Sequence, residues 1–269
     1  MSTSKHDASA RERRVTRMGS GLHGQIVNTL GQEIIDGSAA TGSLMNADEL
    51  VERFGVSRSV VREALRTLGS LGLVEARPQV GTRVLPPEAW DLLSPQVVTW
   101  RARGLQYESQ LRELLELRHG VESSAAELAA RRASDESGTQ LVELAAHMRA
   151  AFEAGNADQF YAHDAEFHRL VLESAGNIVI AQLAETISAA FNARRDNRSS
   201  PGAHTVSAEA VAQHEELANA IRGRDERGAN QAVRDLVLHS IRELEDQQEV
   251  TRRLSAALQA ARDARAEAR

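Results

Sequence analysis

Hydrophobic side chains recur every three or four residues through most of the chain, the spacing that places them on one face of an α-helix. One stretch departs from that period. Residues 73–87, "LVEARPQVGTRVLPP", carry strand-forming residues on both sides of a turn that contains Pro, Gln and Gly, which predicts a small β-hairpin. The pattern as a whole predicts a mainly α fold.

Three helices are expected ahead of the hairpin, and the third is the most informative. The first two span about 21–37 and 46–54, and a glycine turn follows them. The third, "SRSVVREALRTLGSLG", turns an apolar stripe inward while arginines repeat every four residues on another face: Arg58, Arg62 and Arg66. Helix, short helix, turn, arginine-faced helix and hairpin follow one another in the order of a winged helix-turn-helix domain.

Such a domain suits DNA, because a helix fits the major groove and an arginine fork can bond both acceptors of a guanine. On that reasoning Arg58 and Arg62 contact bases, and Ser57 at the helix N-terminus meets a phosphate. Gly81 and Thr82 in the hairpin approach the DNA backbone or the minor groove. An arginine stripe that merely solvates a helix is the alternative. The predicted DNA-contact residues are Ser57, Arg58, Ser59, Arg62, Gly81 and Thr82.

Beyond Pro86 and Pro87 the chain has helical period almost throughout, broken by short turns that contain Gly, Asn or Ser. No strand pattern competes there, so this part is predicted to be an all-helical antiparallel bundle. The expected helices span about 95–103, 107–133, 136–154, 157–174, 178–195, 207–223 and 226 onward.

These patterns divide the chain into five parts. The first, residues 1–19, is expected to be a flexible basic arm, because it is polar, rich in arginine and without periodicity. The other four are a winged helix-turn-helix domain at 20–87, a linker at 88–106, a helical bundle at 107–245 and a helical or frayed tail at 246–269.

Charge differs between the two main parts of the chain. Residues 1–87 carry 11 Lys and Arg against 9 Asp and Glu, whereas residues 88–269 carry 21 against 29. A basic small domain ahead of an acidic larger one suits a DNA reader joined to a module that does not bind DNA.

Two absences narrow the class of protein further. The chain has no cysteine, which excludes disulfides, thiolate metal sites and cysteine nucleophiles. No uncharged apolar run approaches the roughly 18 residues of a membrane helix, and the N-terminus has no apolar secretory signal. We therefore expect a cytoplasmic protein without a membrane partner.

The run "HDAEFH", residues 163–168, holds two histidines and two carboxylates, which can ligate a metal or face water on a helix. An acid four residues before a histidine occurs three times in the chain, where about 1.3 are expected by chance. Asp164 and His168 share one helix face, but His163 lies about 140° away from His168. Spacing alone leaves both interpretations open.

The stretch of residues 44–84 contains the pattern "ELxxxFGVSRxxVREALRxLxxxGLVxxRPxxGTxV". It resembles the DNA-binding domain of the GntR family of bacterial transcription regulators, and the resemblance implies DNA contacts by Arg58, Arg62 and Gly81. Two positions depart from the family. Asp48 stands where an arginine often touches DNA, and Gln79 stands where a wing glycine is common. Because an acid repels phosphate, Asp48 bears on operator sequence and affinity.

The second part of the chain contains "LRELLELRHGVESSAAELAA", "HDAEFHRLVLESAGN" and "QHEELANAIRGRDERGANQAVRDLVLHSI". These stretches are similar to successive helices of the FCD domain, the effector module of the FadR branch of GntR regulators. The resemblance implies ligand binding and dimerisation by residues 107–245, with Arg118 pairing with the carboxylate of an effector. A metal-free pocket whose histidines bind an anion directly is the rival interpretation. The implied ligands of a divalent metal, Zn²⁺ or Ni²⁺, are Asp164, His168, His214 and His239.

Residues 88–104, "EAWDLLSPQVVTWRARG", resemble the joint of sugar-acid regulators, although Trp90 and Trp100 suit hinge packing equally well. The implied effector is a small carboxylate, with a sugar acid as the first choice and lactate or another hydroxy acid as the second. We expect a homodimeric repressor whose two heads bind an inverted repeat in operator DNA.

Two other functions compete with the sensor. A helical domain that only dimerises would leave a DNA-binding protein without an effector. A metal-dependent enzyme is a remote alternative, because the chain lacks a general-base motif such as HExxH and has no strand pattern around the histidines.

Overall fold

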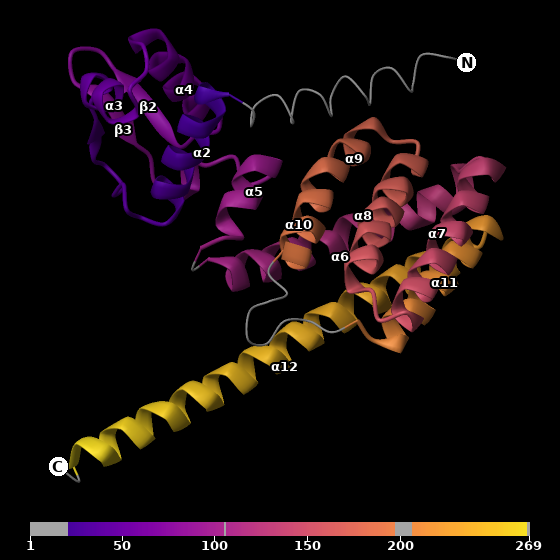
Figure 1. Ribbon diagram of the computed structural model, residues 1–269. Helices are drawn as coiled ribbons and strands as arrows, with labels where there is room; N and C mark the ends of the chain where they lie inside the picture. The colour runs from indigo at the N-terminus through magenta and orange to yellow at the C-terminus, as the bar shows by residue number, and fades with distance from the viewer. Residues whose placement is uncertain (1–20, 105, 197–205, 268–269) are drawn as a thin grey trace. The chain divides into compact units, whose positions relative to one another are not determined.

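The computed structural model describes residues 21–104, 106–196 and 206–267, and the chain divides into two compact units, Met1–Gln106 and Tyr107–Arg269 (Figure 1). The first unit holds a small sheet among helices, and the second is helical in its described residues. The prediction of a mainly α chain, with a winged helix-turn-helix ahead of a helical bundle, is confirmed. The predicted basic arm, 1–19, lies outside the described residues.

The first unit has the predicted order of elements, with one addition. Strand β1 lies between the segments predicted as the first two helices, and it pairs with β3, so that the antiparallel sheet has the order β1-β3-β2. Two residues are too few to show the period of a strand. In chain order the elements are α2 (Leu22–Ile35), β1 (Leu44–Met45), α3 (Ala47–Phe54), α4 (Arg58–Ser70), β2 (Val74–Arg77), β3 (Gly81–Val84), η1 (Pro87–Ala89) and α5 (Pro95–Arg101).

Within the segment 88–106, predicted to be a linker, Trp90, Val97 and Trp100 pack into the core of the first unit. Trp100 on α5 is fully buried, and its indole lies so close to Gly31 on α2 that a Cβ there would come within 2.5 Å of it. Its Nε1–H donates to Oδ1 of Asn28 over 3.2 Å, and that of Trp90 donates to a backbone carbonyl over 3.1 Å. Both tryptophans therefore fasten this segment to the unit that precedes it.

The second unit is a bundle of seven helices in its described residues. The helix predicted at 178–195 is two helices, because Leu183 forms a turn between α9 and α10. No helix of the described chain has both the length and the apolar character needed to cross a membrane. The helices are α6 (Tyr107–Arg132), α7 (Asp135–Glu153), α8 (Ala157–Ser174), α9 (Ile178–Gln182), α10 (Ala184–Asp196), α11 (Ala208–Arg222) and α12 (Glu226–Glu267).

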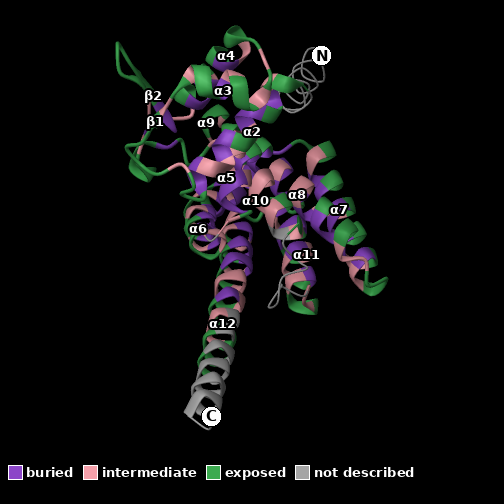
Figure 2. Cartoon of the chain, turned by 60° about the vertical axis from the view of Figure 1, so that its left-hand side comes forward, coloured by how far each residue is buried: buried purple, intermediate pink, exposed green. Residues whose placement is uncertain are grey.

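Helix α8 is central in this unit, since it packs against α6, α7 and α10, while α11 packs against α7 and α12 (Figures 1 and 2). The core is apolar and includes Phe167 and Val171 on α8 and Leu217 on α11, all with no exposed surface. Asp164 and His168 on α8 and His214 on α11 are buried as well. Burying such polar groups is costly unless they find partners, so their surroundings decide what they do.

Candidate functional site

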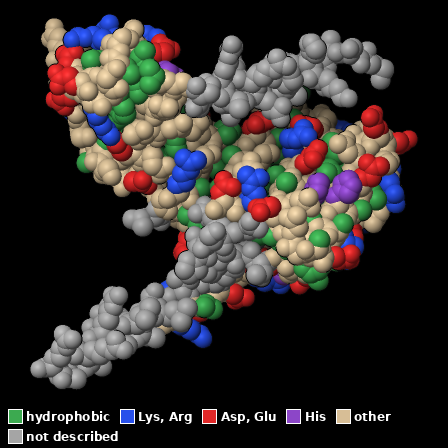
Figure 3. Space-filling view, in the orientation of Figure 1, with side chains coloured by type: hydrophobic (Ala, Val, Ile, Leu, Met, Phe, Trp, Pro, Cys, Tyr) green, Lys and Arg blue, Asp and Glu red, His purple; other side chains and the backbone are tan. Residues whose placement is uncertain are grey.

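Helix α4 carries the predicted DNA-contact side chains on its exposed face. Arg58 and Arg62 are exposed, while Val61 and Ala64 on another face of the same helix are fully buried. Ser57 is the N-cap residue, and its hydroxyl lies 2.8 Å from that of Ser59. The backbone N–H groups at this helix start are therefore beside two hydroxyls that can meet a phosphate. Basic and acidic side chains lie next to one another on the surface of this unit (Figure 3).

The wing of the same unit carries the other two residues predicted to contact DNA. Gly81 begins β3 with φ of +119°, a conformation that favours glycine, and the side chain of Thr82 is half-buried. Gln79, where the family pattern has glycine, also has positive φ, at +62°. The turn keeps the left-handed conformation that the family pattern suits, even though the residue differs.

Asp48, the other departure from the family pattern, forms an ion pair with Arg58. Both side chains are exposed, Asp48 in the first turn of α3 and Arg58 in the first turn of α4. The acid therefore lies next to an arginine that is predicted to contact a base.

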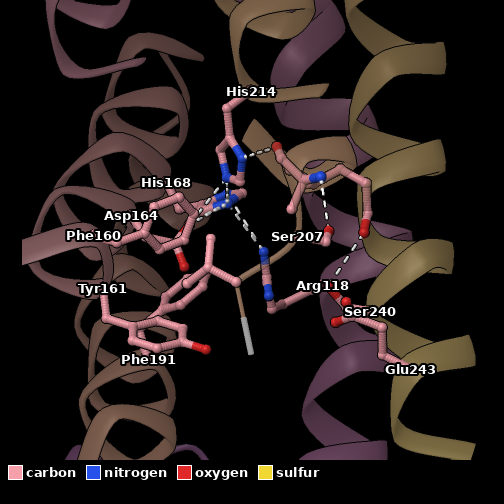
Figure 4. Close-up of a pocket in the computed structure, with 13 residues that line it drawn as sticks. Arg118, Phe160, Tyr161, Asp164, His168, Phe191, Ser207, His214, Ser240 and Glu243 are labelled. Carbon is pink, nitrogen blue, oxygen red and sulfur yellow. Dashed lines mark hydrogen bonds and ion pairs between the residues drawn. The ribbon is translucent and has the colours of Figure 1, made fainter. Parts of the chain in front are cut away.

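Three of the four predicted metal ligands converge inside the helical unit (Figure 4). The carboxylate Oδ1 of Asp164 lies 3.3 Å from Nε2 of His168 and 3.0 Å from Nε2 of His214, and the two Nε2 atoms are 3.2 Å apart. Asp164 and His168 are one helical turn apart on α8, as their spacing predicts. Spacing did not predict the approach of α11, which brings His214 to them.

The outer nitrogen of each imidazole is bonded away from this centre. Nδ1 of His214 lies 2.6 Å from the carbonyl oxygen of Ala210, one turn earlier on α11. Nδ1 of His168 lies 2.7 Å from a carboxylate oxygen of Glu122 on α6. An Nδ1–H that donates outward leaves the Nε2 lone pair directed to the centre, which is the arrangement of a metal-binding histidine.

The separations fit a metal ion. Two ligands about 2.0–2.1 Å from a tetrahedral Zn²⁺ lie about 3.3 Å apart, and an octahedral ion brings them slightly closer. The three distances among Asp164, His168 and His214 span 3.0 to 3.3 Å. One carboxylate and two imidazoles suit Zn²⁺ or Ni²⁺ and leave further coordination positions for oxygen ligands.

Glu122 is fully buried beside this centre and balances a buried arginine. Its carboxylate accepts from Nε and Nη2 of Arg118 over 2.7 and 3.3 Å. Burial alone would raise the pKa of Glu122, but Arg118 and His168 outweigh burial and lower this pKa to about 2. Burial would likewise raise the pKa of Asp164, but His168 and His214 outweigh burial and hold this pKa well below the ordinary range.

His168 experiences opposite influences. Burial disfavours its charged form, but the carboxylates of Glu122 and Asp164 favour that form and keep the pKa of His168 above its ordinary value. Its ring also stacks on Phe191 of α10, with centroids 4.8 Å apart. The same aromatic ring receives the guanidinium of Arg118 at 4.3 Å. Aromatic and ionic contacts together fix both side chains.

His239, the fourth predicted ligand, is not brought into this group. It lies on α12 with its Nε2 3.1 Å from both the hydroxyl of Ser207 and a carboxylate oxygen of Glu243. Its Nδ1 lies 3.5 Å from a carboxylate oxygen of Glu209. These acceptors at the start of α11 and on α12 hold the imidazole, and the metal-ligand group among the described residues comprises three side chains.

A small pocket adjoins the three ligands. Its walls combine the ligands and Arg118 with three polar side chains that the sequence did not indicate: Ser207, Ser240 and Glu243. Phe160, Tyr161 and Phe191 are among its apolar lining residues. Arg118, predicted to bind an effector, does line this cavity, but its Nε and Nη2 also face Glu122 and His168.

Of the residues that sequence reasoning missed, Glu122 had a signal. It follows Arg118 by four residues on one helix, the spacing of a side-chain ion pair. The polar residues from α11 and α12 had none, because only the packing of these helices brings them to the cavity.

Two family models match the chain. The model described as "Bacterial regulatory proteins, gntR family" matches residues 22–84, which run from α2 to β3. The model described as "FCD domain" matches residues 113–239, which include Arg118, Asp164, His168 and His214. The two matches fall in separate units of the structure.

Curated relatives match across both units. The chain is 31% identical over 225 residues to the "Galactonate operon transcriptional repressor" of Escherichia coli (strain K12), which is 82% of this chain and 96% of that protein. It is 30% identical over 192 residues to the "HTH-type transcriptional repressor NanR" of Klebsiella aerogenes, covering 71% and 73%. It is also 30% identical over 175 residues to the "Probable D-xylose utilization operon transcriptional repressor" of Paenarthrobacter nicotinovorans, covering 62% and 65%.

Among solved structures, that of Lar, which "controls the expression of the Listeria monocytogenes agr system", is similar with a TM-score of 0.51 and 20% identity. The match covers 85% of this chain and 96% of that one. At this identity the likeness shows the fold alone.

Proposed function

Because this chain belongs to the GntR family of bacterial regulatory proteins and carries an FCD domain, we propose that it is a repressor that senses a small organic acid at a metal site. The family consists of DNA-binding transcription regulators and not of enzymes. The proposal concerns what this regulator detects, how it reads DNA and how the two are coupled.

The proposed sensor function rests on one observation. The buried side chains of Asp164, His168 and His214 converge beside a cavity. We propose that they hold a divalent ion, Zn²⁺ or Ni²⁺. A bound ion of this kind supplies open coordination positions that a carboxylate or hydroxyl oxygen can fill. Arg118, in the same wall, adds a positive charge for the carboxylate of the effector. A cavity that binds the acid through these side chains without a metal is the second form of the proposal.

The polar side chains on the other wall of the pocket favour a sugar acid as the effector. Ser207 and Ser240 present hydroxyls, and Glu243 presents a carboxylate that accepts hydrogen bonds from the hydroxyls of a polyhydroxy acid. Relatives named for a galactonate operon and for D-xylose utilisation support a sugar-derived effector. Lactate or another short hydroxy acid is the second choice, since it satisfies the metal and arginine but does not engage Glu243.

For DNA, we propose a homodimer in the cytoplasm whose two winged-helix heads bind an inverted repeat. The proposed contacts are Ser57, Arg58, Ser59, Arg62, Gly81 and Thr82, which the first unit presents on α4 and the wing. Effector binding releases the operator only if the effector has different affinities for the DNA-binding and the released states.

Metal analysis of the full-length protein after dialysis tests the site. We expect stoichiometric divalent metal in the parent and its loss in His168→Ala and in His214→Ala. His163→Ala is the matched control, because it removes the neighbouring histidine of the same run and should retain the metal. His239→Ala should also retain it.

Thermal melting with a panel of sugar acids and short hydroxy acids tests the effector. A ligand that binds the folded protein raises Tm, and Glu243→Gln should reduce this rise for a sugar acid more than for lactate. A rise without bound metal favours the metal-free pocket. Absence of both metal and any rise in Tm would leave a domain that only dimerises.

A further inference from the structure

Two acidic side chains are buried among the described residues, Asp164 and Glu122. Asp164 belongs to the metal-ligand group, whereas Glu122 does not and has no exposed surface. It lies on α6, between Arg118, one turn earlier on the same helix, and His168 on α8. A carboxylate in the interior is costly unless both oxygens are bonded. Here one oxygen lies 2.7 Å from Nε of Arg118 and the other 2.7 Å from Nδ1 of His168.

The contact with His168 settles which nitrogen of that ring is available. A carboxylate accepts but does not donate, so the proton must be on Nδ1, and Nε2 faces Asp164, His214 and Nη2 of Arg118. His214 is held in the same way, but by the carbonyl of Ala210 on its own helix. The two imidazoles thus have different supports, one from the backbone and one from a side chain on another helix.

The contact with Arg118 has a separate consequence for charge. Arg118 and Glu122 neutralise each other, and Asp164 leaves the group with a single negative charge when both histidines are neutral. A divalent ion changes this to a single positive charge, which matches one carboxylate of an effector. A positive charge that was not balanced by Glu122 would instead oppose binding of the cation.

We propose that Glu122 is the positioning residue of the metal site, which fixes the ring of His168 for coordination and shields the ion from the charge of Arg118. This inference rests on the proposed function, since it assumes that the three ligands hold a metal. Outer partners of this kind typically change metal affinity by about 10–100-fold.

A matched pair of double variants separates positioning from the burial of charge. Arg118→Met/Glu122→Gln and Arg118→Met/Glu122→Leu both remove the ion pair, but only the Glu122→Gln change keeps a side-chain oxygen that can accept from Nδ1–H of His168. Replacing both partners avoids the unpaired buried charge that either single change leaves and that can prevent folding. Full-length proteins are titrated with Co²⁺ and Zn²⁺ alone, by visible absorption and by chelator competition.

The Gln variant should bind both ions within a few-fold of the parent, and the Leu variant about 10–100-fold more weakly. Equal affinities of the two variants would overturn the proposal. Nitrogen-15 NMR of histidine in the metal-free proteins gives a second readout. A slowly exchanging Nδ1–H of His168 should be present in the parent and the Gln variant and lost in the Leu variant.

The two proposals fail in different ways. If the parent binds no metal, the metal site is wrong and the role of Glu122 in metal binding is wrong with it, whatever the NMR shows. If the parent binds metal and the His168 Nδ1–H persists in the Leu variant, the site stands and Glu122 does not position it.

Discussion

Each unit of this regulator contains an arginine and a carboxylate in an ion pair, and the two pairs differ in exposure. The side chains of Arg58 and Asp48 are 66% and 59% exposed, whereas those of Arg118 and Glu122 are 6% and 0% exposed. Water and salt screen the first pair, so its partners can separate at a cost of at most about 1 kcal/mol. Separating the second leaves a buried charge unbalanced.

The comparison explains why the same residue types serve different purposes. An arginine that reads DNA must leave its partner for a base edge, so a weak, solvated pair suits Arg58. An arginine beside the proposed metal and effector must keep its place, so a buried pair suits Arg118. Burial is what distinguishes the two pairs, and substitutions in each pair test this.

The largest expected effect is on stability. Glu122→Ala leaves Arg118 buried without its carboxylate and should lower the free energy of unfolding by about 3–5 kcal/mol. Asp48→Ala removes the exposed counterpart and should lower it by less than about 1 kcal/mol. Urea denaturation of the two variants in metal-free buffer measures both changes. Similar losses for the two would show that burial does not separate the pairs.

The next effect is on the acid dependence of stability. The pKa of Glu122 is lowered from 4.5 to about 2 in the folded protein. A lowered pKa means that the stabilisation is fully present above pH 4.5 and is lost as the pH falls towards 2. The loss from this carboxyl is on the order of 3 kcal/mol. Urea denaturation across this pH range measures it.

The control for the acid dependence is Arg118→Met/Glu122→Gln, which has no titrating carboxyl at position 122. Its stability should fall less between pH 4.5 and 2, by the share that Glu122 contributed, while the share of Asp164 persists. An equally steep fall would assign the acid sensitivity to other carboxyls.

A smaller effect is expected in the affinity for DNA. Arg62→Ala removes a predicted base contact from the second turn of α4 and should weaken binding to an operator by about 1–3 kcal/mol. The operator is first selected from random duplexes with the parent protein. Arg66→Ala is the control, because Arg66 lies one turn further along and pairs with Glu63. For Arg66→Ala, fluorescence anisotropy should show a smaller loss of affinity, which is similar for the operator and for other duplexes. Equal losses of sequence specificity in Arg62→Ala and Arg66→Ala would contradict the assignment.

The comparison also shows what the sequence could predict. The inward stripe and the arginine face of α4 follow from helical spacing, because both belong to one element. The pairing of Asp164 with His168 follows for the same reason. The arrival of His214 does not, since it depends on how α11 packs against α7 and α12, and only the resemblance to a family supplied it.

Two differences between the predictions and the structure have physical reasons. The turn at Leu183 interrupts an apolar period without any glycine or proline, so the pattern predicted one helix where the structure has two. His239 was expected among the metal ligands from the resemblance, but the orientation of its ring depends on Ser207 and Glu243, which spacing cannot bring together. Side-chain partners across helices are decided by packing, which a local pattern does not contain.

The smallest expected effect concerns the exposed pair itself. Asp48→Asn retains a side chain of the same size but releases Arg58 and removes an acid from the predicted DNA surface. Because Coulomb energy between exposed groups is weak, the affinity for a non-operator duplex should rise by no more than about fivefold at low salt. The gain should vanish as salt is raised, since screening removes the repulsion that the acid exerted. Anisotropy titrations at two salt concentrations measure it, and a gain independent of salt would mean that Asp48 acts through the shape of α3 instead.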